Sequence, residues 1–342
     1  MITVSAKELH RLHHVDEFTP QGLVPSAEKP ERVDVIESAL IEAGFGESVE
    51  ASEFGVDPIK RVHSPTYVDF LADAHREWIE SEGAPEDTDA FPLVFPTPDT
   101  AEKEWTDIRA RFGRHSFDTD AIGRHTWQAA VGAVDVALTG QRLVAQCATG
   151  VFSLCRPPGH HAMADRFGGY CYLNNAAISA QAFVDEGARP AILDLDFHHG
   201  NGTQSIFYER HDVLYASLHA DPSSDYPYFY GHADETGAAA GDGYNLNLPL
   251  PAGTDWSAYG EALSMAVKAI TGFSPDVLIV SLGVDTALED PDSFRLVADD
   301  YPRIGRTISS LGLPTLFIME GGYELAVLGR NVAAVFTGFE SA

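Results

Sequence analysis

The sequence has few cysteines, few basic residues and no long apolar run. The three cysteines, Cys147, Cys155 and Cys171, cannot form a disulfide framework, and no CxxC pair is present for a redox or zinc-knuckle site. We expect each to be a small buried apolar residue. No segment reaches the roughly 20 apolar residues of a membrane-spanning helix, and the N-terminal segment lacks the features of a signal peptide. The sequence therefore predicts a soluble, cytoplasmic protein.

The shortage of basic residues makes the chain strongly acidic. With 51 acidic and 22 basic residues, its 342 residues have a formal net charge of −29. This charge repels phosphate backbones and anionic membrane surfaces, so we expect neither a nucleic-acid nor a membrane partner. It favours cationic ligands instead. Hydrophobic residues at 44% and aromatic residues at 10% are values of a globular protein, which excludes overall disorder.

Short apolar runs alternate with segments of helical spacing along the chain. The runs predict buried strands at 150–155, 191–195, 213–218, 277–282 and 314–319. Helical spacing is present at 31–43, 67–82, 175–185, 203–209, 256–272, 301–311 and 324–338. This alternation predicts one α/β domain over residues 1–342, with a mostly parallel multi-stranded sheet and helices on both faces.

Residues 80–120 differ from the rest of the chain. They contain four prolines, 11 acidic and 4 basic residues, and they show no sustained periodicity. A loop of this length in a compact domain is usually functional or disordered. We interpret the segment as a long acidic excursion from the single domain.

Polar side chains follow four of the predicted strands. Ligands bind outside the carboxyl ends of the strands in open parallel sheets, so residues at these points are candidates for a site. They are His160 and His161 after the first strand, Asp194, Asp196 and His198 at the second, Asp285 after the fourth, and Tyr323 after the fifth. The convergence of these residue types on one sheet edge predicts an active site there.

Asp196 and His198 are two positions apart, so in an extended segment both side chains point the same way. Together with Asp285 they form a set of two carboxylates and one imidazole, which leaves a fourth position open, as in catalytic zinc sites. Fe²⁺ and Co²⁺ also accept such ligands. The tandem His160-His161 supplies a general base and a neighbouring imidazole, and Tyr323 offers a hydroxyl to a developing oxyanion. By contrast, we interpret His13-His14 as a surface pair. The set predicts a metal-dependent hydrolase.

The segments that carry these residues resemble motifs of the histone deacetylase superfamily. They are RPPGHHA (156–162), FGGYCYLNNAAI (167–178), DLDFHHGNGTQSIFY (194–208), SLHADP (217–222), SLGVDT (281–286) and MEGGY (319–323). A weaker likeness is visible at KPER (29–32). Within the superfamily the chain is most similar to the bacterial acetylpolyamine amidohydrolases, in its length, its acidic excursion and the segment 207–222. The resemblance implies an arginase-deacetylase-like fold and deacetylation of small acetylated polyamines such as acetylputrescine, acetylcadaverine, acetylspermidine and acetylspermine.

The resemblance also implies a role for individual residues. It implies zinc on Asp196, His198 and Asp285, with His161 as general base, and Tyr323 polarising the scissile carbonyl. His160 would be an electrostatic partner oriented by Asp194. Asn201 departs from the class I pattern, which has Asp there, and an Asn makes His161 less basic.

Further residues are assigned by the same resemblance. A structural K⁺ would use Asp194, Asp196, His198, Ser217 and the backbone of Leu218, and a second K⁺ would lie near Phe207, Arg210, Val213 and Tyr244. Tyr170 and Tyr226 match the sides of a substrate tunnel, and Gly169 matches a backbone acceptor for the substrate amide. The excursion would pack across a homodimer interface.

Selectivity for a cationic substrate requires carboxylates at the tunnel mouth, and aromatic rings that contact the methylene chain. The candidates are Phe18 with Glu17, Asp118 with Asp120, and Asp290 with Asp292.

Three other functions have requirements that can be compared with this sequence. A two-manganese ureohydrolase needs Asp-x-His-x-Asp and Asp-x-Asp, but Gly200 and Ala287 stand where the extra carboxylates are required. A protein or acetoin-related deacetylase would use the same chemistry with a more open tunnel mouth. A non-catalytic acyl-lysine binding module would need a broken ligand set or a lost tyrosine, and the sequence shows neither.

Overall fold

The computed structural model describes residues 1–342 except 7, 47, 98–99, 101–104, 292 and 342. Its centre is an eight-stranded sheet of order β4-β1-β5-β10-β9-β6-β7-β8, in which every pairing is parallel. The strands are β1 (Ile2–Ser5), β4 (Ser48–Glu50), β5 (Gly150–Ser153), β6 (Pro190–Asp194), β7 (Leu214–Ala220), β8 (Asn245–Leu250), β9 (Val277–Leu282) and β10 (Thr315–Met319). An antiparallel hairpin is formed by β2 (Asp16–Thr19) and β3 (Gly22–Pro25).

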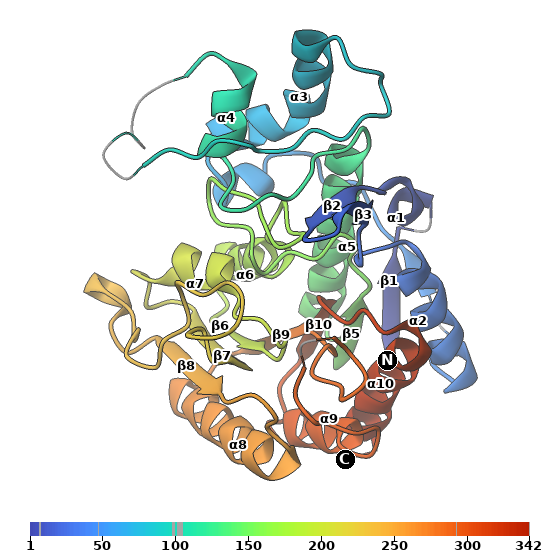
Figure 1. Ribbon diagram of the computed structural model, residues 1–342. Coiled ribbons are helices and arrows are strands. Elements are labelled where there is room, and N and C mark those ends of the chain that lie inside the picture. The colour runs from blue at the N-terminus through green and yellow to red at the C-terminus, as the bar shows by residue number, and fades with distance from the viewer. Residues whose placement is uncertain (7, 47, 98–99, 101–104, 292, 342) are drawn as a thin grey trace.

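Helices cover both faces of the sheet (Figure 1). One face is packed by α2 (Glu31–Glu42), α8 (Trp256–Phe273), α9 (Tyr301–Ser309) and α10 (Leu325–Glu340), and the other by α5 (Thr126–Ala145) and α6 (Asn175–Asp185). The remaining helices are α1 (Glu8–Leu12), α3 (Pro65–Glu82), α4 (Ile108–Arg114), α7 (Asn201–Phe207) and the 3₁₀ turns η1 (Ile59–Arg61) and η2 (Ala239–Gly241). The predicted α/β architecture is therefore confirmed.

The central strands are apolar throughout because both faces of the sheet are buried. In β6, Leu193 packs with the helices of one face, and its neighbour Ile192 packs with those of the other. The same alternation is present in β9, at Val280 and Ile279. Side chains two residues apart share a face, so each strand supplies both cores and is a continuous apolar run in the sequence.

The five predicted strands and seven predicted helices are all present, with ends shifted by a few residues. The long helix α5 was missed because most of its side chains are buried, so it lacks the polar face on which a periodicity argument depends. The edge strand β8 was missed because its sequence, NLNLPL, contains two asparagines and a proline, which are depleted in strands.

The acidic excursion has more regular structure than the sequence predicts. Its first residues complete α3, and Ile108–Arg114 form α4, where Phe112 packs edge to face against Phe70 of α3 at 5.3 Å between ring centroids. A bridge between Ala90 and Ile122 closes the base of the segment. The helix predicted over 67–82 accounts for the first part, but the prediction of an irregular loop was wrong for α4, because tertiary contacts with α3 stabilise this short helix.

Two smaller predictions about burial were also wrong. Cys147 is exposed, whereas Cys155 and Cys171 are buried as expected. His13 is not part of a surface pair, because its side chain is 2% exposed and its Nδ1 lies 3.2 Å from the Thr126 hydroxyl. Both outcomes depend on how the N-terminal segment and the end of α5 pack, which local sequence does not encode.

A buried group of charges connects the N-terminal segment to the sheet. Glu28 accepts hydrogen bonds from Arg32 at 2.7 Å and from Arg156 at 3.0 Å, and all three side chains are at most 2% exposed. Arg156 also donates to the backbone carbonyls of His10 and His13. The two guanidinium groups therefore share one carboxylate as their counter-charge, and all three groups are buried away from solvent.

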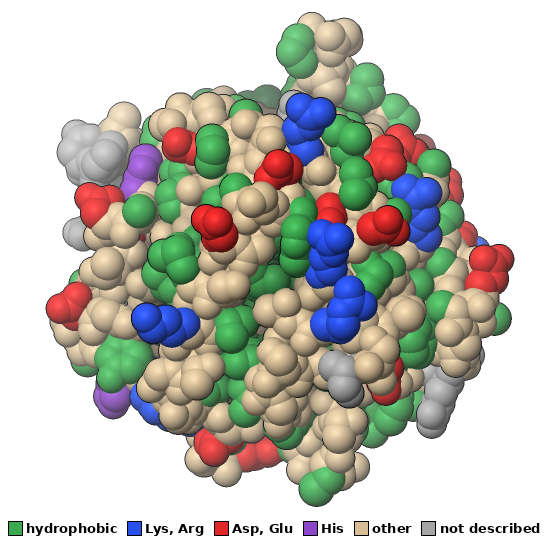
Figure 2. Space-filling model, turned by 90° about the horizontal axis from the view of Figure 1, so that it is seen from below, with side chains coloured by type: hydrophobic (Ala, Val, Ile, Leu, Met, Phe, Trp, Pro, Cys, Tyr) green, Lys and Arg blue, Asp and Glu red, His purple; other side chains and the backbone are tan. Residues whose placement is uncertain are grey.

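The molecular surface carries the net negative charge without forming one acidic patch on the face drawn in Figure 2. There, acidic side chains are interspersed with basic and apolar ones. Within the part of the chain that the structure describes, no helix is both long and apolar enough to cross a membrane.

Replacing the shared carboxylate should destabilise the fold. We expect Glu28→Ala to lower the free energy of unfolding by about 3–5 kcal/mol, because it leaves two buried guanidinium groups without a counter-charge. Urea unfolding followed by circular dichroism measures this change. Arg11→Ala, which breaks an exposed ion pair with Asp34, is the matched control and should leave the unfolding midpoint unchanged. An equally small effect of Glu28→Ala would contradict the role of this group.

Candidate metal centre and active site

The segment that follows β6 brings a carboxylate and an imidazole together at the carboxyl edge of the sheet. The Nδ1 atom of His198 lies 3.3 Å from Oδ1 of Asp196 and 3.2 Å from Oδ2 of Asp285. The segment is bent rather than extended, so the expected geometry of the pair was wrong although the residues meet. The bend lets the backbone N–H of His198 donate to Asp196 at 2.9 Å.

This group fits a divalent cation. The possible ligand atoms of Asp196, His198 and Asp285 all lie within 4.8 Å of one another. Both carboxylates are 1% exposed, whereas the His198 side chain is 23% exposed and faces the cavity described below. Two buried carboxylates beside one imidazole are stabilised by a cation, and they leave a position open on the solvent side.

Surrounding backbone groups orient the two carboxylates. The N–H of Gly321 donates to Oδ2 of Asp196 at 2.7 Å, and the N–H of Phe197 donates to Oδ1 of Asp285 at 2.9 Å. A Cβ atom at Gly283 or Gly321 would collide with these carboxylates. The glycines that follow β9 and β10 are therefore needed for space, and they let the strand ends approach closely.

Two histidines lie beside the group of Asp196, His198 and Asp285, and their pKa values are shifted in opposite directions. His160 and His161 follow β5, and their ring centroids are 4.0 Å apart. Burial opposes protonation of His160, but the carboxylates of Asp196 and Asp194 outweigh it and raise its pKa to about 10. Its Nδ1 lies 3.2 Å from Oδ2 of Asp194, so Asp194 orients the ring.

His161 has the opposite shift. Burial lowers its pKa well below the ordinary value, and the neighbouring His160 and His198 lower it further. Its Nδ1 lies 2.7 Å from Oδ1 of Asn201. Because this oxygen only accepts, Nδ1 carries the hydrogen and Nε2 is free to receive a proton. The ring is neutral and faces the cavity.

Tyr323 lies on the turn after β10. This turn is held by Asp290, a residue that the sequence analysis expected at the tunnel mouth. The Asp290 carboxylate accepts hydrogen bonds from the backbone N–H groups of Tyr323 at 3.0 Å and Glu324 at 3.2 Å, and the side chain is buried. The structure therefore places Asp290 beneath the tyrosine turn rather than at a tunnel mouth. The guanidinium of Arg32 lies 5.1 Å from the Tyr323 ring centroid. Asp292 lies outside the described residues.

A cavity of about 520 Å³ leads to the group. It is lined by His161 and His198, by aromatic rings, by three carboxylates and by a few small residues. The full lining is Glu17, Phe18, Ala27, Asp118, Thr119, Asp120, His161, Gly169, Tyr170, His198, Tyr226, Pro291 and Tyr323. None of these described lining residues is Lys or Arg. The structure thus brings together most of the residues predicted for a substrate tunnel.

The carboxylates of the cavity are paired with its tyrosines. Tyr226 donates to Oδ2 of Asp118 at 2.6 Å, and Tyr170 donates to Glu17 at 2.6 Å. The backbone N–H of Gly169 also donates to Asp118, and that of Tyr170 donates to Asp120. Burial raises the pKa of Asp118, and burial together with the Asp118 charge raises that of Asp120.

Gly169 lies where only glycine fits. Its φ angle is +58°, and a Cβ atom there would collide with the His161 ring. At the cavity entrance, Phe18 is 46% exposed and contacts Phe91 of the excursion, with 4.6 Å between ring centroids. Gly169 is therefore packed closely against the His161 ring, and an exposed aromatic ring lines the cavity at Phe18.

The residues predicted for two K⁺ sites are also close together. Asp194 and Ser217 are register partners on β6 and β7, and Leu218 follows on β7. In the second group, the N–H of Arg210 donates to the Phe207 carbonyl at 2.9 Å, and the Tyr244 carbonyl accepts from Tyr215 at 3.0 Å. Val213 immediately precedes β7. K⁺ binding at either place stays a prediction.

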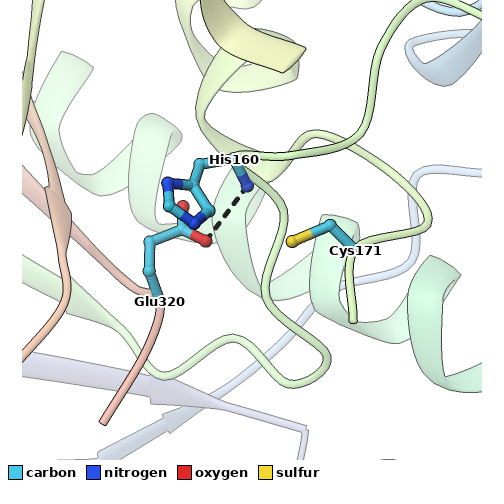
Figure 3. A group of neighbouring side chains, drawn as sticks. All are labelled: His160, Cys171 and Glu320. Carbon is cyan, nitrogen blue, oxygen red and sulfur yellow. Dashed lines mark hydrogen bonds between the residues drawn. The ribbon is translucent and has the colours of Figure 1, made fainter. Parts of the chain in front are cut away.

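Sequence reasoning gave no role to four ionisable residues. Arg32, Arg156 and Glu320 lie within motifs that it singled out, and Glu28 directly precedes one of them. The signal available was the position of ionisable residues inside apolar or glycine-rich segments. Glu320 is 0% exposed and lies beside His160 and Cys171 (Figure 3). The possible ligand atoms of these three residues also lie within 4.8 Å of one another. However, Oε2 of Glu320 is already engaged by hydrogen bonds from the N–H groups of Gly159 and His160.

The fold and this site define a class of protein. A model described as the histone deacetylase domain matches residues 26–339. The chain therefore belongs to the histone deacetylase domain family, whose members are metal-dependent.

Particular relatives are more similar than the family as a whole. Acetylpolyamine amidohydrolase 2 of Pseudomonas aeruginosa is 50% identical, with 99% of each chain covered. Acetylpolyamine amidohydrolase of Mycoplana ramosa is 46% identical, with 97% of each chain covered. The crystal structure of acetylpolyamine aminohydrolase from Burkholderia pseudomallei superposes with a TM-score of 0.94 at 39% identity, covering 100% of this chain and 99% of the other.

The three-residue donor set makes a direct prediction about metal content. We expect Asp196→Ala, His198→Ala and Asp285→Ala each to lose the bound divalent metal, because two remaining ligands seldom retain one. Elemental analysis after dialysis measures the stoichiometry. Glu17→Gln is the control, because Glu17 lines the same cavity outside the donor set and its replacement should leave the metal content unchanged. Full metal content in all three alanine variants would show that the donor set is wrong.

Proposed function

We propose that the protein is a zinc-dependent deacetylase of small acetylated polyamines, which it hydrolyses to the free amine and acetate. The observation that carries this proposal is the acidic, aromatic cavity that ends at the Asp196, His198 and Asp285 group and has no Lys or Arg among its described lining residues. The full-length similarity to acetylpolyamine amidohydrolases supports it. Fe²⁺ and Co²⁺ are alternative occupants of the same ligands.

In this proposal Asp196, His198 and Asp285 bind the metal, which when bound polarises the amide carbonyl and makes water more acidic. His161 accepts the proton of the attacking water at Nε2, since its ring is neutral, and later donates a proton to the leaving amine. His160, whose Nδ1 atom is held by Asp194, remains protonated and stabilises negative charge nearby. Tyr323 donates its hydroxyl hydrogen to the developing oxyanion, since burial holds its pKa well above the ordinary value.

The cavity walls supply the selectivity for cations. Glu17, Asp118 and Asp120 place negative charge along the path of a polyamine chain, and Tyr170 and Tyr226 stand beside them. Phe18 offers a ring at the entrance, where a cation–π contact contributes roughly 0.5–2 kcal/mol. A slim ammonium chain is compatible with this cavity, whereas a bulky neutral substrate gains none of these contacts.

The proposal includes two structural K⁺ ions, at the Asp194–Ser217 and Phe207–Tyr244 groups, a cytoplasmic location, and a homodimer formed through the excursion. Support for the dimer comes from three consecutive apolar residues, Leu93, Val94 and Phe95, which are 71%, 58% and 45% exposed. A patch of this kind on an otherwise acidic segment indicates a protein contact surface. It lies on the segment whose Phe91 contacts Phe18 at the cavity entrance.

The chemical roles can be separated from metal binding. We expect Tyr323→Phe to lower kcat about 10²–10³-fold and His161→Ala about 10²–10⁴-fold, with metal content unchanged. Acetate release from acetylputrescine, together with elemental analysis, measures both. Tyr228→Phe is the control for a tyrosine outside the cavity lining and should leave kcat unchanged. A loss of less than about tenfold in Tyr323→Phe would contradict its oxyanion role.

The carboxylate walls predict a pH dependence of cation recognition. Because burial raises the pKa values of Asp118 and Asp120, these groups gain protons at a higher pH than ordinary carboxylates. Lowering the pH should therefore raise KM for a cationic acetylated diamine relative to KM for a neutral N-alkylacetamide. Asp118→Asn should raise KM for the cation roughly 10-fold or more, since a hydrogen bond to a charged group contributes about 1.5–3 kcal/mol. A ratio of the two KM values that stays constant with pH would contradict the proposal.

The dimer surface is tested by adding charge to it. We expect the double variant Leu93→Asp, Val94→Asp to be monomeric in light scattering and to turn over acetyl-lysine peptides faster than the wild type, because the cavity entrance is less enclosed. Met265→Asp, at an exposed apolar side chain of α8, is the matched control and should not change the mass in solution. A wild-type monomer, or a dimeric double variant, would exclude this surface as the interface.

A further inference from the structure

Glu320 is a buried carboxylate that the proposed reaction does not use. It is the residue after β10, its side chain is 0% exposed, and it lies beside His160 and Cys171. Its Oε2 atom accepts a hydrogen bond from the backbone N–H of His160 at 3.1 Å (Figure 3), and another from that of Gly159 at 2.7 Å. Its Oε1 atom accepts one from the Ser281 hydroxyl at 3.2 Å.

The histidine turn that Glu320 contacts, residues 157–161, has no helix or strand to support it. Other elements bind the carbonyl side of this region. The N–H of Thr203 donates to the His160 carbonyl at 3.1 Å, and the Asn174 side chain donates to the Ala162 carbonyl at 3.1 Å. Among the described residues, Glu320 is the side chain that binds the N–H side at Gly159 and His160.

A shift of this turn would move both histidines together. His161 must place Nε2 toward the cavity while Nδ1 stays on Asn201, and His160 must keep Nδ1 on Asp194. A displacement of about 1 Å of a reacting group can cost about 100-fold in rate. Buried N–H groups without acceptors would also draw the turn toward other partners.

We propose that Glu320 is a positioning residue for His160 and His161. Its carboxylate oxygen sets the place of the turn through two backbone hydrogen bonds, and it acts on the reaction through the histidines without touching the substrate. The expected effect on kcat rests on the proposed function, whereas the expected position of the histidine turn does not depend on it.

Two variants separate the geometry of Glu320 from its charge. Glu320→Gln keeps an acceptor oxygen at the same reach, and its amide can donate to Ser281. Glu320→Asp keeps the charge but withdraws the oxygen by one methylene. We expect Glu320→Gln to retain kcat within about threefold and Glu320→Asp to lose about 100-fold, with KM and metal content unchanged in both. Neither variant adds volume to the core.

Acetate release from acetylputrescine and elemental analysis are the first measurements. Asp135→Glu is the control, because Asp135 is another buried carboxylate that accepts a backbone N–H, that of Phe54 at 2.9 Å, far along α5 from the histidine turn. It should lower the melting temperature without lowering kcat. Cys171→Ser tests the neighbouring thiol and should leave kcat and metal content unchanged.

Only one order of activities supports the inference, with Glu320→Gln well above Glu320→Asp. Equal activities, the reverse order, or loss of a metal equivalent from either variant would overturn it. Crystal structures of the two variants give a readout that is independent of turnover. The histidine turn should be displaced in Glu320→Asp and unchanged in Glu320→Gln, and an undisplaced turn in Glu320→Asp would overturn the inference even if the wild type proved inactive on acetylated polyamines.

Discussion

The concentration of buried negative charge at one edge of the sheet is the constraint on which the rest of the site depends. Asp194, Asp196, Asp285 and Glu320 are each at most 1% exposed, and they lie at the ends of adjacent parallel strands. Carboxylates without solvent must be compensated. Imidazoles and backbone N–H groups provide part of this compensation, and the Asp196, His198 and Asp285 group is arranged so that a divalent cation would provide the rest.

The groups that compensate the buried charge differ from one carboxylate to the next, and this difference sets the pKa values of the neighbouring histidines. Burial opposes protonation of His160, but Asp196 and Asp194 together raise its pKa, whereas His161 has only the neutral Asn201 at its Nδ1. Two adjacent histidines therefore have pKa values shifted in opposite directions. A neutral imidazole beside a more basic one fits the proposed roles, in which His161 is the general base and His160 an electrostatic partner.

The cavity walls extend this pattern to the substrate. Asp118 and Asp120 follow α4 on the acidic excursion, and their oxygens accept hydrogen bonds from Tyr226 and from the backbone of Gly169 and Tyr170. The excursion is thus hydrogen-bonded to the cavity wall, and it also carries the exposed apolar residues Leu93, Val94 and Phe95. A single segment therefore contributes both to the proposed selectivity and to the proposed assembly.

The sequence by itself determined the parallel α/β architecture and the residues at the strand ends, because strands buried on both faces are visible as apolar runs and the chain direction places their carboxyl ends at one edge. Asp196, His198, Asp285, His160, His161 and Tyr323 could be selected on that basis. Only the tertiary structure decided which supporting groups each one has. Asp290 lies under the tyrosine turn, His13 is buried beside Arg156, and Glu320 binds the histidine turn, since these contacts join segments far apart in the chain and leave no local pattern.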